Sequence, residues 1–270
     1  MTRSVSPPAS VLTIAGSDSG GGAGIQADLK TFAAHGIHGL SALTALTAQH
    51  TRGVTAVHAP PVGFLAAQID ACFEDFDVRA IKIGMLATAD IVTAVADALD
   101  ARPRVPVVLD PVMIATSGAK LLDDDALEAL RTRLIPRAAV LTPNIPEAEF
   151  LLGRSIHSSD EAEAALHALR ALGARGVLLK GGHLIEGDTV VDRYAASDAA
   201  FSHRAPRLAI DGHGTGCTLS SAIAARIARG EPADTACRGA IDYVHAAMRA
   251  AYRPGRSDVS VLGHLAPPAP

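Results

Sequence analysis

The sequence of 270 residues contains no tryptophan, and aromatic residues make up only 3% of it. Because 49% of the residues are nevertheless apolar, the core has to be packed mainly from aliphatic side chains. Glycine and alanine are abundant, which is typical of a globular α/β protein with close packing between elements. The length is sufficient for one large domain with a sizeable core.

Cysteine is scarce as well. Cys72, Cys217 and Cys237 are odd in number and far apart in the sequence. This spacing excludes a disulfide framework and a cysteine-based zinc cluster. We therefore expect a protein of the reducing cytoplasm.

The chain also lacks long runs of one charge and long apolar runs. The formal net charge is −4, and lysine and arginine are scattered, so nucleic acid and membrane surfaces are not expected as partners. Residues 1–10 contain no apolar segment like that of a signal peptide, and no apolar run is long enough to span a bilayer.

Short apolar runs alternate with amphipathic helical patterns along the chain. Such alternation predicts a parallel sheet covered by helices on both faces, with ligands bound beyond the carboxyl ends of the strands. One domain over residues 11–264 is expected, between flexible ends at 1–10 and 265–270. Residues 189–206 differ and predict a β-hairpin. The expected strands are 11–15, 41–48, 55–59, 80–83, 107–109, 140–142 and 177–179, and the expected helices are 24–35, 62–73, 89–99, 125–135, 160–172, 218–228 and 233–251.

A glycine-rich loop, residues 16–24, follows the first expected strand. Its five glycines, beginning with Gly16, allow the backbone to approach a ligand closely. A Walker A loop would require Gly-Lys-Ser/Thr at its end, which is absent. A dinucleotide fingerprint would require a tighter loop and an acidic residue after the second strand, where the chain has Gln49. The loop therefore favours another kind of small-molecule site.

Polar residues follow four further strands. Gln49 offers the donor and acceptor pair that recognises an amino-substituted heterocycle, or it caps a turn. Asp110 is suited to hold magnesium or a magnesium-bound water. Asn144 and Glu147 can face one point, or form a capping box at a helix start. Lys180 can neutralise phosphate, or lie solvated at the strand end. These residues can form a single site if the sheet brings the carboxyl ends of these strands to one edge.

The segment Gly214-Thr215-Gly216-Cys217 leads directly into an expected helix. Glycines allow successive N–H groups to turn inward as an anion-binding nest, and the helix dipole adds positive potential there. Transfer of a phosphoryl group needs such stabilisation of its oxygens. A thiol in the first helical turn is also expected to have a lowered pKa. The segment predicts the phosphate-transfer site of an ATP-dependent kinase; the alternative is a glycine-rich turn with a buried structural cysteine.

Taken together, the segments resemble the hydroxymethylpyrimidine/phosphomethylpyrimidine kinases of thiamine biosynthesis, members of the ribokinase-like superfamily. The resemblance runs from about residue 11 to residue 250. It implies a three-layer α/β/α sandwich with a mostly parallel central sheet and no large separate lid domain. The segments are AGSD at 15–18, GGAGIQADLK at 21–30, TAQ at 47–49, KIGML at 82–86, DPVM at 110–113, TPNIPEAE at 142–149, KGGH at 180–183 and HGTGCT at 213–218.

The resemblance also implies the reaction and the partners. ATP would phosphorylate 4-amino-5-hydroxymethyl-2-methylpyrimidine, and a second ATP would phosphorylate the monophosphate to the diphosphate, with Mg²⁺ as cofactor and a homodimer as the assembly. The implied site residues are Cys217 as the general base and Lys180 as a phosphate contact; Gly214, Thr215 and Gly216 as the anion hole; Gln49, Asp28 and Gly16 as substrate contacts; and Asp110, Asn144 and Glu147 as positioning residues for ATP and for magnesium, which Asp110 and Glu147 would hold through water.

Three departures from the family pattern and two alternatives accompany this reading. The chain has His50 where the family usually has asparagine, Ile210-Asp211-Gly212 before the anion hole, and a different ending from Gly263. A pyridoxal kinase of the same superfamily would share the Gly-Thr-Gly-Cys segment, but Gln49 favours an aminopyrimidine. A non-catalytic pyrimidine-binding module is the other alternative.

Overall fold

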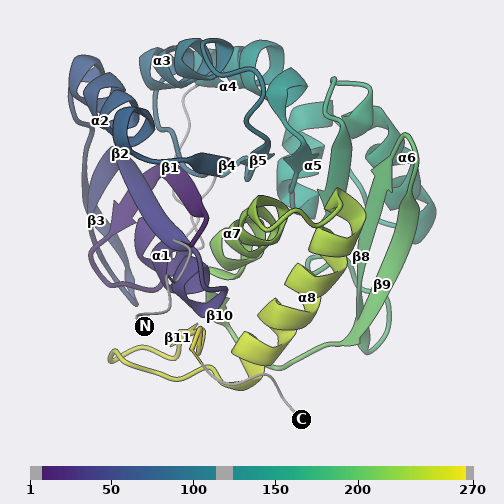
Figure 1. Cartoon of the computed structure of the whole chain (residues 1–270). Helices are drawn as coiled ribbons and strands as arrows, with labels where there is room; N and C mark the ends of the chain where they lie inside the picture. Colours follow the sequence, from purple (N-terminus) through teal and green to yellow (C-terminus); the bar gives the residue numbers. More distant parts are fainter. Residues whose placement is uncertain (1–7, 114–123, 266–270) are drawn as a thin grey trace, which may run out of the picture.

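The computed structural model describes residues 8–113 and 124–265, and a nine-stranded sheet forms its centre (Figure 1). The strand order is β3-β2-β1-β4-β5-β6-β7-β8-β9. Strands β2, β1, β4, β5, β6 and β7 pair in parallel, whereas β3, β8 and β9 are antiparallel at the two ends of the sheet. The strands are β1 Ser10–Asp18, β2 His38–His50, β3 Gly53–His58, β4 Val78–Ile83, β5 Val107–Leu109, β6 Val140–Leu141, β7 Gly176–Leu179, β8 Thr189–Ala196 and β9 Ala200–Pro206.

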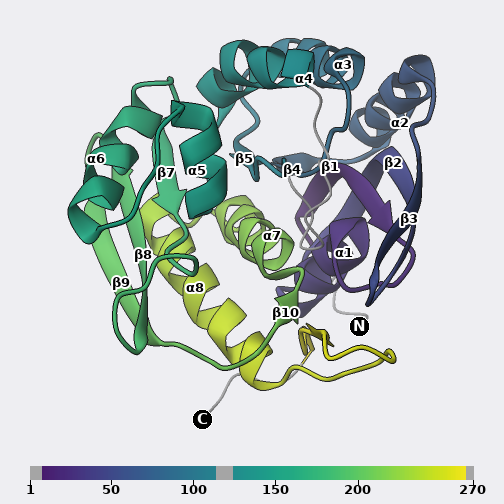
Figure 2. The same cartoon turned by 180° about the vertical axis from the view of Figure 1, so that it is seen from behind.

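Helices cover both faces of this sheet, and each face has its own hydrophobic core (Figures 1 and 2). Successive strand residues point to opposite faces, so Val11 packs in one core and Leu12 in the other. The first core lies against α2 Val62–Asp75, α3 Ala89–Asp100, α4 Asp124–Ala129, α5 Ile145–Leu152 and α6 Ser159–Arg170, and the second lies against α1 Gly24–Ala34, α7 Thr215–Ala228 and α8 Ala233–Arg249. The three-layer, mostly parallel sandwich expected from the sequence is confirmed.

The elements differ from the sequence prediction in a few places. The predicted helix at 125–135 is α4 followed by a π-helical turn, η1 Leu130–Leu134, and a 3-10 turn, η2 Ile135–Arg137. Pro136 has no N–H to continue an α-helix, which accounts for the tighter ending. The short helix α5 was foreseen only as a helix start at Asn144. The hairpin expected over residues 189–206 is present as β8 and β9.

A second, two-stranded sheet was not foreseen. It pairs β10 Gly212–His213 with β11 Ser260–Val261, so the segment before α7 is joined to residues near the end of the chain. Next to it, the buried His264 ring lies 3.0 Å from the Thr218 hydroxyl in the first turn of α7. These contacts fix the start of α7, which Figure 2 shows at the strand β10.

Within residues 8–113 and 124–265, no helix combines the length and the hydropathy needed to cross a bilayer. The predicted flexible ends, 1–10 and 265–270, lie mostly outside the described residues. Strand β1 already begins at Ser10, and Leu265 is exposed.

Candidate active site

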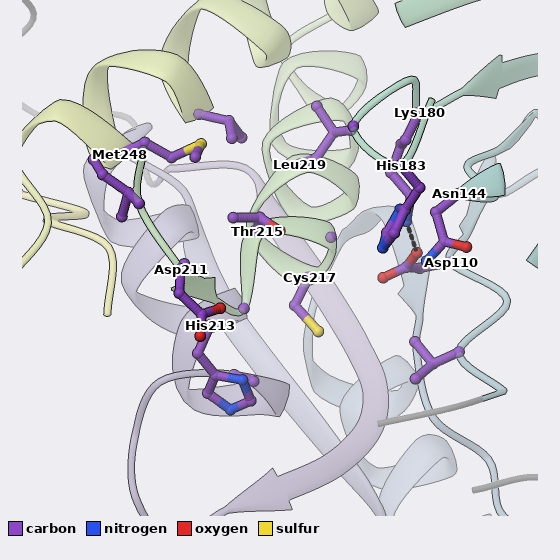
Figure 3. A pocket seen from close by; sticks show the side chains of 18 of the residues that line it. Asp110, Asn144, Lys180, His183, Asp211, His213, Thr215, Cys217, Leu219 and Met248 are labelled. Atoms are coloured by element: carbon purple, nitrogen blue, oxygen red, sulfur yellow. Dashed lines mark hydrogen bonds and ion pairs between the residues drawn. The ribbon is translucent and has the colours of Figure 1, made fainter. Parts of the chain in front are cut away.

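A cavity of about 720 Å³ opens at the carboxyl ends of the parallel strands. Helix α7 begins there, and the carboxyl ends of β1 and β2 and the segments that follow β5, β6 and β7 contribute to its lining (Figure 3). The sequence-predicted residues that line it are Gly16, Gln49, Asp110, Asn144, Glu147, Lys180, Gly214, Thr215, Gly216 and Cys217. The sheet therefore brings together all the predicted site residues except Asp28.

The start of α7 depends on glycine at two positions. Gly214, the N-cap of α7, has a φ of 83°, and a side chain there would overlap the carbonyl oxygen of Gly22. A Cβ on Gly216 would lie 3.1 Å from the Lys180 ammonium and 3.4 Å from an Asp110 oxygen. The first N–H groups of a helix have no acceptor within the helix. In α7 these groups come from cavity-lining residues, so they can bind an anion.

Cys217 lies in the first turn of α7 and points into the cavity (Figure 3). Burial raises the pKa of its thiol to about 11, and this effect outweighs the opposing attraction of Lys82. The prediction that the helix start lowers the thiol pKa is therefore wrong. Cys217 is therefore a neutral thiol at neutral pH.

Three charged side chains form a cluster opposite Gly216. The Lys180 ammonium lies 2.9 Å from Asp110 Oδ1 and 3.6 Å from Glu147 Oε2, and all three side chains are largely buried. Burial raises the pKa of Glu147 to about 7; Lys180 opposes this rise and Asp110 adds to it. The carboxylates and the ammonium thus hold each other in place beside the anion-binding helix start.

The capping box expected as one reading of Asn144 and Glu147 is present. The Asn144 side chain accepts from the Glu147 N–H at 2.8 Å, and the Glu147 carboxylate accepts from the Asn144 N–H at 2.7 Å. Both residues also line the cavity, so the cap and the site are compatible. Helix α5 in this way fixes the orientation of one carboxylate of the cluster.

Gln49 is the last residue but one of β2 and lines the cavity. Its Nε2 lies 2.9 Å from Nε2 of His213, and its Oε1 accepts a 3.2 Å hydrogen bond from the Thr47 hydroxyl. Both Nε2 and Oε1 of Gln49 can make a further hydrogen bond, because the nitrogen carries two hydrogens and the oxygen two lone pairs. The neighbouring departure, His50, is exposed and does not line the cavity.

Sequence reasoning missed the part played by Asp18. Its carboxylate accepts from the backbone N–H groups of Gly20, Gly22 and Ala23 at 2.7–2.9 Å and lies 3.4 Å from His213 Nε2. Burial would raise the pKa of Asp18, but these hydrogen bonds lower it below its usual value. Asp18 thereby ties the glycine-rich loop to β10. An acidic residue two positions before four closely spaced glycines was the available signal.

Asp28 is the one predicted site residue that does not line the cavity. It is fully buried in α1, where its carboxylate binds Lys82 at 2.9 Å, Thr13 at 2.6 Å and Ser221 at 2.7 Å. A direct contact between Asp28 and a substrate does not fit this position. Gly16, by contrast, does line the cavity, at an irregularity in the pairing of β1 with β2.

Magnesium held through water fits the charged cluster. The repulsion between Asp110 and Glu147 that helps to raise the pKa of Glu147 would be relieved by a divalent cation. The described part of the chain contains no group of three or more His, Cys, Asp or Glu side chains placed to hold a metal. Two carboxylates would therefore leave most of the coordination shell to water and phosphate oxygens, which Mg²⁺ favours.

The three-layer sandwich, with a helix-start anion site, a lysine and two carboxylates at the strand ends, defines a ribokinase-like small-molecule kinase. More specifically, the chain belongs to the phosphomethylpyrimidine kinase family, whose sequence profile matches residues 18–262. It is 51% identical over 245 residues to the hydroxymethylpyrimidine/phosphomethylpyrimidine kinase of Rhizobium meliloti, over 90% of this chain and 91% of that protein. It is also 51% identical over 257 residues to the Thiamine biosynthesis bifunctional protein ThiED of Geobacter sulfurreducens, of whose length it spans 52%.

Solved structures agree with this assignment. The phosphomethylpyrimidine kinase of Clostridium difficile 630 superposes with a TM-score of 0.78 at 43% identity, over 88% of this chain and 98% of that one. The pyridoxal kinase of Staphylococcus aureus in complex with pyridoxal superposes with a TM-score of 0.87 at 31% identity, over 96% of this chain and 94% of that one. The fold is thus shared by both kinds of kinase, and the site has to distinguish them.

Proposed function

We propose that this protein phosphorylates 4-amino-5-hydroxymethyl-2-methylpyrimidine with ATP, and then phosphorylates the monophosphate to the diphosphate, for thiamine biosynthesis. The observation that carries this proposal is the presence of Gln49 in the same cavity as the helix start Gly214–Cys217. An amide that can recognise an aminopyrimidine edge therefore shares one chamber with a group that can stabilise a transferred phosphate.

In the first reaction, the hydroxymethyl oxygen attacks the γ-phosphorus, the bond from phosphorus to the bridging oxygen breaks, and ADP leaves. The N–H groups at the start of α7 and the Lys180 ammonium neutralise the phosphoryl oxygens. Asp110, Asn144 and Glu147 position the ATP phosphates. Mg²⁺, when bound through Asp110 and Glu147, supplies further charge neutralisation. The hydroxyl proton passes to the sulfur of Cys217 when that thiol is ionised.

Gln49 is proposed to select the substrate. A pyrimidine that carries an amino group beside a ring nitrogen presents a donor and an acceptor, and one carboxamide satisfies both. Pyridoxal has no amino group at that position. We therefore place the aminopyrimidine edge between Gln49 and the start of α7, near Gly16.

The direct test is a substrate panel with analysis of the products. The purified protein, with ATP and Mg²⁺, is expected to convert hydroxymethylpyrimidine to the monophosphate and then to the diphosphate. Turnover of pyridoxal alone would establish the pyridoxal kinase alternative. The absence of ADP release with every hydroxymethyl heterocycle would instead indicate a binding module.

The variant Gln49→Leu is expected to lower kcat/KM for hydroxymethylpyrimidine by about 10²-fold, since two buried polar groups of the substrate lose their partners at about 1–3 kcal/mol each. The activity on pyridoxal, if present, should change much less. Steady-state kinetics with both substrates measure the difference. An equal loss on both would mean that Gln49 supports the local structure and does not read the pyrimidine.

A homodimer is also proposed, with the edge strand β3 as its interface. Residues 55–58 of this strand are all exposed, and Val57 is 49% exposed. An open edge strand readily pairs with a second chain. Val57→Lys is expected to shift the protein from dimer to monomer in light scattering after gel filtration. A monomeric wild-type protein would refute this assembly.

The cytoplasm is the proposed location. Cys72, Cys217 and Cys237 are all free thiols in the structure. The proposed chemistry also requires ATP, and Cys217 has to stay reduced to accept a proton.

A further inference from the structure

A buried ion pair lies outside the cavity and has no part in the proposed reaction so far. The Lys82 ammonium in β4 lies 2.9 Å from Asp28 Oδ2 in α1, and both side chains are fully shielded from solvent. Thr13 donates to the same carboxylate oxygen, and Ser221 donates to the other at 2.7 Å. Taking two charges out of water is costly, so such a pair is weak evidence for added stability. Its position relative to the active site suggests another role.

The pair lies beneath Cys217. Ser221, which holds Asp28, follows Cys217 by four residues in α7, so both side chains lie on the same face of that helix. Across from them, Gly24 and Asp28 are also four residues apart in α1. The Gly24 N–H faces the Cys217 sulfur, while Asp28 binds Ser221. Two helices thus meet at matched positions, with the thiol one turn above the ion pair.

Charged side chains from four parts of the fold interact electrostatically with the Cys217 thiol. Lys82 of β4 attracts the thiolate, whereas Asp28 of α1 and Asp110 after β5 repel it. Lys180, after β7, also interacts electrostatically with Cys217. Of these groups, Lys82 and Asp28 are the two that solvent and a bound nucleotide cannot reach. Their influence on the thiol is therefore built into the fold.

We propose that Lys82 and Asp28 are positioning residues, which from beneath the active site jointly set the reactivity of the Cys217 thiol. Lys82 favours the thiolate and Asp28 limits this effect, while the bond from Asp28 to Ser221 holds the first turns of α7 against α1. The inference rests on the proposed function only in giving Cys217 a part in phosphoryl transfer. The coupling between the ion pair and the thiol is a property of the free protein.

The coupling predicts opposite effects of two variants. Lys82→Met should shift the pH profile of Cys217 alkylation by iodoacetamide to higher pH, and Asp28→Asn should shift it to lower pH, each by about one unit or more. At fixed pH, the alkylation rate should change by about threefold per unit, since a less basic thiolate is also a weaker nucleophile. Mass spectrometry of the alkylated peptides separates Cys217 from Cys72 and Cys237, which serve as internal controls.

The inference can be tested even if Lys82→Met does not fold. Lys82→Met leaves a buried carboxylate unpaired, so the double variant Lys82→Met/Asp28→Asn, which removes both charges, is measured beside it. Its profile should lie between those of the two single variants and at higher pH than that of the wild type, because Lys82 acts on the thiol more strongly than Asp28 does. If Lys82→Met does not fold, the double variant is compared with Asp28→Asn and the wild type, and its profile should lie at higher pH than both. The inference would be overturned if removing Lys82 and removing Asp28 shifted the pH profile of Cys217 alkylation in the same direction, or if Asp28→Asn did not shift it.

The same alkylation experiment separates this inference from the proposed function. It uses no ATP and no pyrimidine, so it does not depend on kinase activity. If the alkylation profiles shift as expected and Cys217→Ala retains full kinase activity, the assignment of Cys217 to the reaction fails while the coupling stands. If the profiles do not respond and Cys217→Ala is inactive, the coupling fails while the proposed function stands.

Discussion

Replacing Cys217 with aspartate is expected to slow the phosphorylation of the monophosphate about 10²-fold, with a much smaller effect on the phosphorylation of the hydroxymethyl group. In the second reaction the acceptor is itself a phosphate, which carries a charge of about −1.5 to −2 at pH 7. A carboxylate about 4 Å away opposes each unit of that charge by about 1 kcal/mol in water and about 4 kcal/mol near a protein surface. A repulsion energy between these two values would lower the rate by about two orders of magnitude.

The two reactions also differ in their need for a base. A hydroxymethyl group has to lose a proton, whereas a phosphate with a second pKa near 6 is already ionised at neutral pH. Because burial raises the pKa of Cys217 to about 11, its thiol is neutral when the anionic acceptor approaches. The first reaction should therefore accelerate between pH 7 and pH 9 as more thiolate forms, while the second should change little.

Cys217→Ala and Cys217→Asn are the matched controls. Both remove the base without adding charge, so they should impair the first reaction more than the second, which is the reverse of Cys217→Asp. Single-turnover measurements, started separately from hydroxymethylpyrimidine and from its monophosphate, resolve the two steps. An equal loss of both activities in Cys217→Asp would show that charge at this position does not govern the second transfer.

The parts of the site that sequence could predict are those set by local pattern. Apolar runs of strand length fix where each strand ends, and polar residues directly after those runs meet at one edge of the sheet. Asp110, Asn144, Glu147 and Lys180 were found in this way, as was the helix start from Gly214 to Cys217. Their convergence follows from the parallel strand order, which the alternation of strands and helices already indicates.

What could not be predicted depends on contacts between distant residues. The family resemblance implied that Asp28 contacts the substrate, but its side chain binds Lys82, 54 residues away. The pairing of β10 with β11 joins residues nearly 50 positions apart. The thiol pKa of Cys217 was mistaken for the same reason. The helix start is a local feature, whereas burial, the dominant effect, arises from the packing of α1, β4 and α7 around it.

Replacing Lys180 with methionine is expected to lower kcat for both phosphorylations by about 10³-fold, the size of effect that a cation aimed at the transferred phosphate produces. The fold should survive, because Glu147 can take up a proton once the ammonium is gone. Lys180→Arg keeps the charge but not the compact ammonium shape, and it should recover part of the rate. Thermal melting would check that all variants remain folded.

The pH profile distinguishes loss of the phosphate contact from a general disturbance of the site. Lys180 lowers the pKa of Glu147 and Asp110 raises it, so Lys180→Met should move the acid limb of kcat/KM for ATP to higher pH, and Asp110→Asn should move it to lower pH. The raised pKa of Glu147 also determines how the stability of Lys180→Met depends on pH. Its folded state binds the Glu147 proton more tightly than the unfolded chain, so stability is lost as the pH rises above the ordinary Glu pKa of 4.5, and the loss continues above pH 7 because the Lys180 ammonium no longer lowers the Glu147 pKa. An acid limb that stays in place in both variants would mean that the ionisation of Glu147 does not control ATP binding at this site.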